Sequence, residues 1–405
     1  MGNVQLQGQS IHVTLSECEG SPGSLSLWAQ TSGDSSVVVL THHDRRMTLT
    51  FCYWTHLKTY LILRDDKESV IIASLMKQYG FNFQWMCSWN PDQRPQPADE
   101  RALDFLAGFG FNFVRLPVDY RFWTSGFDYF HPDESVFRCI DHYLEACRSR
   151  GIHMSLNLHR APGYCTDRKD PEQHNLWVDD VAQNAFVFLW EAFARRYRDV
   201  PGNALSFDLI NEPPSPGQSG ITRANHAALI RRTVAAIRGI DEDREIVIDG
   251  LGGGYMAMPE LAHLGVTQSG RGYHPMPVSH HQASWWADHA RAPEPKYPGL
   301  RWQGRRWDRA TLRDSYRGWR EVERRGAKIH IGEFGCFRHT PNDIALRWLT
   351  DLLGVFKELD WGYALWQFQG PFGIVEHGRP GARFESLAGY SVDRTLLDLM
   401  LENRT

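Results

Sequence analysis

The sequence predicts an α/β protein: eight short apolar runs alternate with amphipathic segments, the pattern of a (β/α)8 TIM barrel, and a small all-β domain precedes them. The alternation begins near Gly80, whereas the residues up to about Asp66 alternate with a period of two. The chain has 405 residues, of which 42% are hydrophobic and 23% charged, as in ordinary globular proteins. One barrel of about 250 residues or more and one small domain account for this length.

The first part of the chain is predicted to be an accessory β-sheet domain over residues 1–70 with a sandwich-like arrangement. Five runs rich in β-branched and aromatic residues predict its strands. They are residues 11–16, 24–30, 35–41, 46–54 and 59–65. Trp28, Tyr53 and Trp54 could present flat faces to a sugar. The domain is therefore either a carbohydrate-binding module or a structural domain that packs against the barrel or mediates dimerisation.

The barrel is predicted over residues 78–405. Its eight strands are expected at residues 81–86, 111–117, 152–159, 205–211, 246–250, 270–274, 329–335 and 363–368. Helices with one apolar face are expected between them, at residues 99–110, 133–151, 181–197, 226–240 and 344–359. Two glycines lower the strand propensity of the sixth run.

Charge and cysteine content exclude several classes of protein. The 44 Lys and Arg against 48 Asp and Glu give a net charge of −4, so neither nucleic acid nor a membrane surface is an expected partner. The seven cysteines include no C-x-x-C pair, which argues against a disulfide framework and a zinc ribbon. No signal peptide is visible, so we expect a cytoplasmic protein, or a secreted one if a leader has been removed.

Two glutamates stand where a barrel enzyme keeps its catalytic groups, at the C-terminal ends of strands. Glu212 directly follows the run 205–211 and precedes two prolines, and Glu333 lies near the end of 329–335. A buried glutamate is costly unless it is paired or protonated. A salt bridge to Arg115 is one explanation. The other is glycoside hydrolysis, which needs one carboxyl group with a raised pKa and one ionised nucleophile.

Five strings in order, FVRLP, LNLH, LINEP, IGEFG and ALWQF, resemble glycoside hydrolase family 5, the cellulase-like clan of retaining β-glycosidases. The resemblance covers the chain from Gly80 to the C-terminus. It implies that Glu212 is the general acid/base and Glu333 the nucleophile. Because the family retains anomeric configuration, it also implies that the two carboxyl groups lie about 5 to 5.5 Å apart.

The same resemblance implies a set of residues that bind the substrate. Asn211 would form a hydrogen bond with the sugar 2-hydroxyl. Arg115 would keep the nucleophile Glu333 ionised, and Tyr273 would donate a hydrogen bond to Glu333. His159 would line the −1 subsite and Trp366 would form the sugar platform. Many members carry His-x-Tyr where this chain has Arg271-Gly272-Tyr273. Either His274, which we include among the binding residues, or His280 could compensate for this departure.

The predicted partner is an oligosaccharide or polysaccharide, with a β-glucan or a related chain as the expected substrate. The long segment 274–307 holds tryptophans that could wall a cleft and histidines whose spacing does not suit a metal ion, so we expect neither metal nor cofactor. Two alternatives remain open: a carbohydrate-binding pseudoenzyme, and a transglycosylase that uses the same site. The oligomeric state stays open as well.

Overall fold

The computed structural model describes residues 2–6, 9–17, 25–30, 52–54, 57–63, 70–74, 77–87, 94–167 and 170–405. The chain divides into two compact units, Met1–Met76 and Lys77–Thr405.

Two antiparallel three-stranded sheets are described in the first unit. One contains β1 (Gly2–Leu6), β2 (Gln9–Glu17) and β3 (Leu25–Gln30), and the other β4 (Cys52–Trp54), β5 (Leu57–Leu63) and β6 (Val70–Ser74). The predicted run 35–41 lies outside the described residues. The sandwich-like arrangement and the role of this unit stay predictions.

The second unit is a closed barrel of eight parallel strands, which confirms the predicted fold. The strands are β7 (Tyr79–Asn82), β8 (Phe113–Asp119), β9 (His153–Ala161), β11 (Leu205–Asp208), β12 (Glu245–Asp249), β13 (Thr267–Gly272), β16 (Ile329–Phe334) and β17 (Gly362–Leu365). Each strand pairs with the next, and β17 pairs with β7 to close the ring. A short strand, β10 (Tyr164–Cys165), adds antiparallel to β9.

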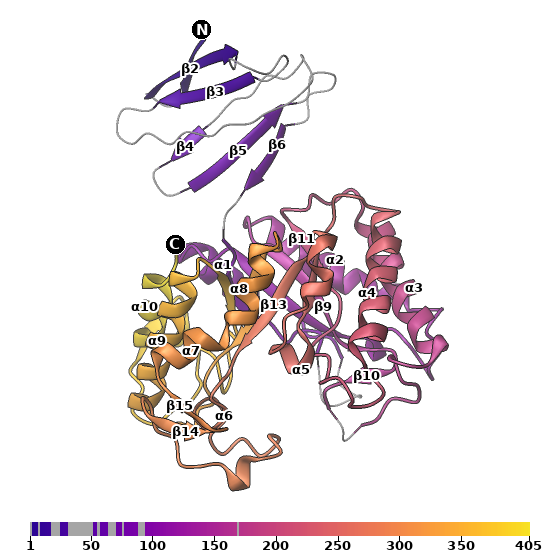
Figure 1. Cartoon of the computed structure of the whole chain (residues 1–405), viewed down its shortest axis with the longest axis vertical. Helices are drawn as coiled ribbons and strands as arrows, with labels where there is room; N and C mark the ends of the chain where they lie inside the picture. The colour runs from indigo at the N-terminus through magenta and orange to yellow at the C-terminus, as the bar shows by residue number, and fades with distance from the viewer. Residues whose placement is uncertain are drawn as a thin grey trace. The chain divides into compact units, whose positions relative to one another are not determined.

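Helices cover the outside of the barrel, with α3 and α4 on one side of the strands and α9 and α10 on the opposite side (Figure 1). The five predicted helices correspond to α1 (Glu100–Gly108), α2 (Glu134–Arg148), α3 (Asp180–Tyr197), α4 (Arg223–Arg238) and α9 (Asn342–Glu358). The others are α5 (Leu251–Gly254), α6 (Met276–Ser279), α7 (Arg309–Ser315), α8 (Arg317–Arg324) and α10 (Arg394–Glu402). Short 3-10 turns occur at Tyr120–Phe122, Pro259–Leu264 and His289–Arg291.

Helix α2 illustrates how the sequence sets a helix start and its buried face. Asp133 caps α2 by accepting from the backbone N–H of Ser135. Phe137, Ile140 and Leu144 then recur on one face of α2 and are buried against the barrel.

Two predicted strands are displaced. The first lies at Tyr79–Asn82 rather than 81–86, and the sixth at Thr267–Gly272 rather than 270–274. The sixth strand begins with polar residues, although all six of its residues are buried. The Gln268 side chain is satisfied there by donating to the Met258 carbonyl and accepting from its N–H. A search for apolar runs therefore misses this strand.

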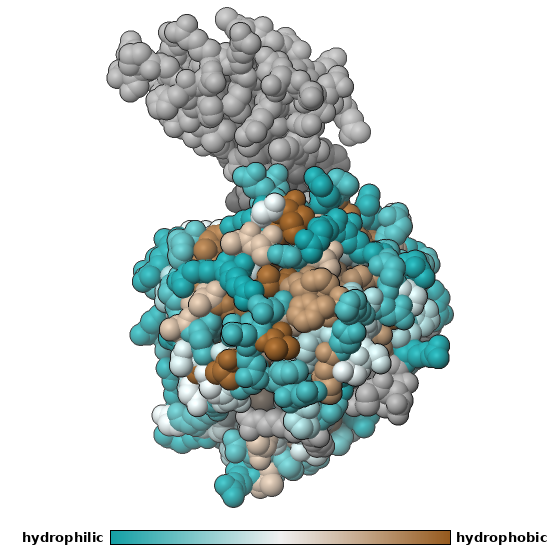
Figure 2. All heavy atoms as spheres, turned by 90° about the vertical axis from the view of Figure 1, so that its right-hand side faces the viewer, coloured by the Kyte–Doolittle hydropathy of each residue, from teal (hydrophilic) through white to brown (hydrophobic). Residues whose placement is uncertain are grey.

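The face of the molecule seen in Figure 2 is mostly hydrophilic in its described part, with apolar residues in small groups. In the part of the chain that the structure describes, no helix is long and apolar enough to cross a membrane. The long segment 274–307 carries α6 and a hairpin of β14 (Leu300–Trp302) and β15 (Arg305–Trp307). A second hairpin, β18 (Phe384–Leu387) and β19 (Tyr390–Asp393), follows β17.

His226 on α4 is a buried polar group whose two ring nitrogens lack a hydrogen-bond partner. Its ring lies 5.8 Å from that of Trp177. Burial lowers the pKa of His226 to about 4, so the ring is neutral in the folded protein. An unfolded histidine titrates near pH 6.5, so the contribution of this group to stability is full above that pH and is lost as the pH falls toward 4.

We predict that the substitution His226→Leu removes part of the acid sensitivity of folding. Between pH 7 and pH 5, the parent protein should lose about 2 kcal/mol more of its unfolding free energy than the variant does. Urea unfolding at both pH values measures this difference, and each protein serves as its own reference. Equal losses in the two proteins would contradict the prediction.

Candidate active site

Glu212 lies four residues beyond β11 in a constrained backbone conformation. Its φ of +47° is in the left-handed region, which costs a non-glycine residue of the order of 1 kcal/mol or more. The Glu212 N–H donates to Asp249 Oδ2 at 2.9 Å, and its carbonyl accepts from the Tyr164 hydroxyl at 2.5 Å. These two bonds hold the backbone in place while a quarter of the side chain, 25%, stays exposed.

Glu333 lies in β16 and is buried. Its Oε1 accepts from Arg115 Nη1 at 2.6 Å, and its Oε2 accepts from the Tyr273 hydroxyl at 3.0 Å. Arg271 Nη2 lies 3.3 Å from Oε1. Two cations and one neutral donor therefore converge on this carboxyl group, an arrangement suited to a carboxylate.

Arg115 on β8 links Glu333 to polar residues of β7 and β11 and of the segment after β11. Its Nε donates to Asp208 at 2.7 Å, its Nη2 to Asn211 Oδ1 at 3.0 Å and its Nη1 also to Asn82 Oδ1 at 3.1 Å. Because two guanidinium groups donate to Asn211 Oδ1, its oxygen must face them. The amide NH2 of Asn211 is then the group that can donate to a substrate hydroxyl.

Arg271 on β13 contacts both glutamates. Its Nε donates to Glu212 Oε1 at 2.9 Å, and its Nη1 donates to Asp249 Oδ1 at 3.0 Å. Its Nη2 bonds Asn211 Oδ1 at 2.9 Å and Asp249 Oδ2. A single planar group thus lies against the two glutamates on which the sequence prediction depends.

The carboxyl groups around these arginines differ in pKa. Burial and the charge of Glu333 raise the pKa of Glu212 to about 7, although Arg271 opposes the rise. Burial and the charge of Asp249 raise the pKa of Asp208 to about 7. Burial would raise the pKa of Asp249 too, but Arg271 and Arg115 outweigh it and hold that pKa below its ordinary value. Glu212 is therefore the glutamate suited to carry a proton near neutral pH.

An aromatic wall completes the mouth of the barrel. Trp366 directly follows β17, and its ring stacks on that of His159 at 5.4 Å with 12° between the planes. Burial, together with Arg115 and Arg271, lowers the pKa of His159 well below its ordinary value, so the imidazole is neutral. A flat indole beside neutral and hydrogen-bonding groups is a surface on which a sugar ring can stack.

Residues 74–370 match the model of the Cellulase family, glycosyl hydrolase family 5. The chain belongs to glycoside hydrolase family 5. Endoglucanase C of Acetivibrio thermocellus is 28% identical over 297 residues, 67% of this chain and 83% of that protein. Cellodextrinase A of Ruminococcus flavefaciens is 25% identical over 291 residues, 68% of this chain and 80% of that protein. As a member of this family, the protein is a glycoside hydrolase that acts on β-glycosidic bonds.

One solved structure is similar to this chain in sequence and fold, and a second shares its fold. The crystal structure of a glycoside hydrolase is 63% identical, with a TM-score of 0.80, and the match covers 82% of this chain and all of that one, 100%. Endoglucanase Cel5A of the hyperthermophilic Thermotoga maritima shares the fold at 20% identity, with a TM-score of 0.65, covering 80% of this chain and 96% of that one.

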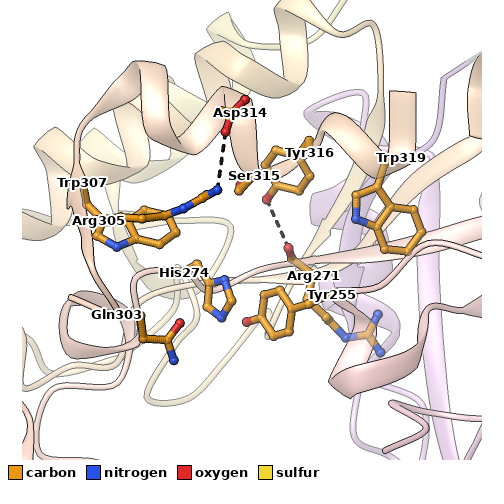
Figure 3. A pocket seen from close by; sticks show the side chains of 10 residues that line it. All are labelled: Tyr255, Arg271, His274, Gln303, Arg305, Trp307, Asp314, Ser315, Tyr316 and Trp319. Atoms are coloured by element: carbon orange, nitrogen blue, oxygen red, sulfur yellow. Dashed lines mark hydrogen bonds and ion pairs between the residues drawn. The ribbon is translucent and has the colours of Figure 1, made fainter. Parts of the chain in front are cut away.

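In this family 5 enzyme, His274 lies apart from the two glutamates. Its ring stacks on Tyr255 at 3.7 Å with 6° between the planes, and Trp307 closes the other side at 5.7 Å. These rings line a cavity of about 270 Å³ with Gln303 and others (Figure 3). Figure 3 shows the Arg271 guanidinium pointing away from His274 and Gln303. Among the described residues, no hydrogen bond links His274 to Glu212 or to Glu333.

The structure also adds residues that the sequence prediction left out of the site. Asp208 and Asp249 are both buried beside the arginines. In the sequence, Asp208 lies within the predicted strand 205–211 and Asp249 lies near the end of the predicted strand 246–250. The signal that could have revealed them is charge balance, because two arginines at strand ends inside a barrel need carboxylate partners. In the part of the chain that the structure describes, no cluster of His, Cys, Asp and Glu is arranged to hold a metal ion.

We predict that Asp208→Asn changes the pH dependence of stability in one direction and Asp249→Asn in the other. A raised pKa means that the contribution of Asp208 is full below pH 4 and is lost as the pH rises toward 7. A lowered pKa means that the contribution of Asp249 is lost as the pH falls below 4. Urea unfolding from pH 3 to pH 8 measures both effects.

As the pH rises from 4 to 7, the Asp208→Asn variant should therefore lose less unfolding free energy than the parent. As the pH falls below 4, the Asp249→Asn variant should lose less unfolding free energy than the parent. Both substitutions keep the shape of the side chain, so each variant is a control for the other. A shift in the same direction for both would show that the two carboxyl groups do not differ in this way.

Proposed function

We propose that this family 5 enzyme hydrolyses β-glycosidic bonds of a β-glucan or a related oligosaccharide or polysaccharide with retention of configuration. Glu212 is the general acid/base and Glu333 the nucleophile. The observation that carries the assignment is the different surroundings of the two glutamates. Glu212 holds a proton near neutral pH, whereas Glu333 accepts hydrogen bonds from Arg115 and Tyr273 and forms an ion pair with Arg271.

The reaction runs in two displacements. Glu333 attacks the anomeric carbon while Glu212 gives its proton to the leaving glycosidic oxygen. Glu212, now a carboxylate, takes a proton from the water that attacks the glycosyl-enzyme, and Glu333 leaves with its bonding electrons. Asn211 donates from its amide to the sugar 2-hydroxyl, a bond that strengthens as positive charge develops on the ring.

The chemical state of each glutamate can be tested with Glu212→Gln and Glu333→Gln on aryl β-glycosides. A strongly acidic phenol leaves without a proton, so Glu212→Gln should still form the glycosyl-enzyme, which then accumulates because no base activates water. Added azide, which needs no base, should release it as the β-glycosyl azide. On a natural glycan, Glu212→Gln should lose about 10² to 10⁴ in rate.

Glu333→Gln should form no glycosyl-enzyme with either substrate and should not respond to azide. NMR of the first product of the parent enzyme should show the β anomer. A product screen on β-glucans, mannan and xylan identifies the glycan, and transfer products in place of reducing sugar would indicate transglycosylation. If either variant kept the turnover of the parent, the assignment of the pair would be wrong.

An exposed aromatic surface supports a substrate longer than one sugar. Trp285 is 57% exposed, and its ring lies 4.8 Å from Phe337 and 6.4 Å from His280. His280 in turn lies 5.0 Å from Tyr273, the donor to Glu333. An unbroken row of rings therefore leads from the nucleophile to an exposed indole.

We predict that Trp285→Ala raises KM for β-glucan chains by about 2- to 10-fold, because stacking on one ring contributes roughly that much. KM for a short aryl β-glycoside should stay at the parental value, because such a substrate does not reach Trp285. Steady-state kinetics with both substrates provides the test and its internal control. An equal increase for both would mean that Trp285 supports the fold of the site and does not bind sugar.

A further inference from the structure

Arg271 occupies an unusual position on its strand. A β-bulge between Gly270 and Arg271 shifts the register of β13 against β16, and beyond the bulge Arg271 pairs with Glu333. Bulges re-aim a side chain, and here the side chain is aimed into the barrel. Arg271 is 1% exposed, so it is shielded from solvent and from substrate. Any influence on the reaction must therefore pass through other residues.

The three nitrogens of the Arg271 guanidinium group form hydrogen bonds with Glu212, Asn211 and Asp249. Nε donates to the Glu212 carboxyl at 2.9 Å, and Nη2 donates to Asn211 Oδ1 at 2.9 Å. Asp249 binds both terminal nitrogens. Asp249 also accepts from the Glu212 backbone N–H at 2.9 Å. The pair formed by Arg271 and Asp249 therefore holds Glu212 at both its backbone and its side chain.

The neighbouring backbone leaves room for this arginine. A side chain on Gly254, which has a φ of +82°, would place its Cβ 2.4 Å from Arg271 Cγ. A Cβ on Gly332 would lie 3.1 Å from Arg271 Nη1 and 2.5 Å from Ser269 Oγ. Both glycines pack against Arg271, one on its stem and one on its head. Glycine at these two positions therefore leaves the space that the Arg271 side chain occupies.

We propose that Arg271 is a positioning residue of this active site: braced by Asp249, it fixes Glu212 relative to Glu333 and Asn211 and sets the upper pH limit of the reaction. The inference rests on the proposed roles of the two glutamates. It gives the arginine a task that a neutral or titrating side chain could not perform at all pH values, because a guanidinium stays charged.

Several charged and titratable groups face Glu212 and Arg271. They are Arg115 on β8, His159 on β9, Asp208 on β11, Asp249 on β12, Tyr255 after α5, Tyr273 after β13 and Glu333 on β16. Of these, Glu333 and Asp249 favour protonation of Glu212, and Arg271 opposes it. The acid must be protonated, so the rate falls as the pH rises through the pKa of Glu212. This fall is the alkaline limb of the pH–rate profile. Removal of the Arg271 charge must then move the alkaline limb to higher pH.

Three variants separate the charge of Arg271 from its shape. Arg271→Gln should move the alkaline limb of kcat upward by about one pH unit or more. It should also lower kcat at the optimum by about 100-fold, because Glu212 loses its support. Arg271→Lys keeps the charge without the planar fork, so kcat should fall while the alkaline limb stays near its parental position. Asp249→Asn removes a charge of opposite sign and should move the limb downward.

Arg271→Gln leaves Asp249 buried without its main partner, which can prevent folding. The double variant Arg271→Gln/Asp249→Asn avoids this problem. Arg271 acts on Glu212 more strongly than Asp249 does, so its alkaline limb should still move upward, but by less. Thermal unfolding identifies any variant that fails to fold. An alkaline limb that stays in place in the double variant and in Asp249→Asn would overturn the proposal.

The result for the Arg271 variants can be distinguished from the result for the glutamate variants Glu212→Gln and Glu333→Gln. If Glu212→Gln and Glu333→Gln are inactive but the Arg271 variants leave the pH profile unmoved, the proposed function stands and this inference fails. If either glutamine variant keeps its turnover, the proposed function fails first. A fall in kcat without any movement of the limb in Arg271→Gln would mean a purely structural role.

Discussion

The burial of two guanidinium ions at the mouth of the barrel is the constraint on which the site depends. Arg115 and Arg271 are both 1% exposed, and an unpaired buried cation would cost several kcal/mol. Four carboxyl groups surround them: Asp208, Glu212, Asp249 and Glu333. Two positive charges need only two negative ones, so a balanced cluster has two neutral carboxyl groups. Asp208 and Glu212, whose pKa values rise to about 7, are the two that hold protons below that pH.

The same balance produces the asymmetry that glycoside hydrolysis requires. A carboxyl group near the arginines becomes ionised where donors converge on it and stays neutral where burial and like charges dominate. Glu333 accepts hydrogen bonds from two side chains and forms an ion pair with Arg271, whereas Arg271 is the one side chain among the described residues that the structure shows donating to the Glu212 carboxyl group. Within one charged cluster, the two glutamates therefore differ in how many hydrogen-bond donors surround each of them.

Much of this could be predicted from the sequence because it depends on local patterns. The alternation of strands and helices predicted the barrel, and the strings around Asn211, Glu212 and Glu333 indicated the two glutamates that we propose as the catalytic pair. Asp208 and Asp249 were missed because their role depends on contacts between strands that are distant in the sequence. Asp249 on β12 contacts Arg271 on the neighbouring strand β13, and Asp208 on β11 contacts Arg115 on β8, from which it is separated by β9. The surroundings of His274 depend on the fold in the same way, since its stacking on Tyr255 is a contact between two loops. Its role in substrate binding stays a prediction.

Arg271 shows how a single change can reorganise such a cluster. An imidazole at this position would lose its charge near neutral pH, while a guanidinium adds a permanent positive charge that must be matched. Asp249 supplies the counter-charge, and Gly254 and Gly332 supply the space. These residues lie on four elements, β12, α5, β13 and β16. The buried arginine needs both the counter-charge and the space that the other three residues supply. The pH dependence of the site then falls on its carboxyl groups alone, because neither arginine titrates and His159 stays neutral.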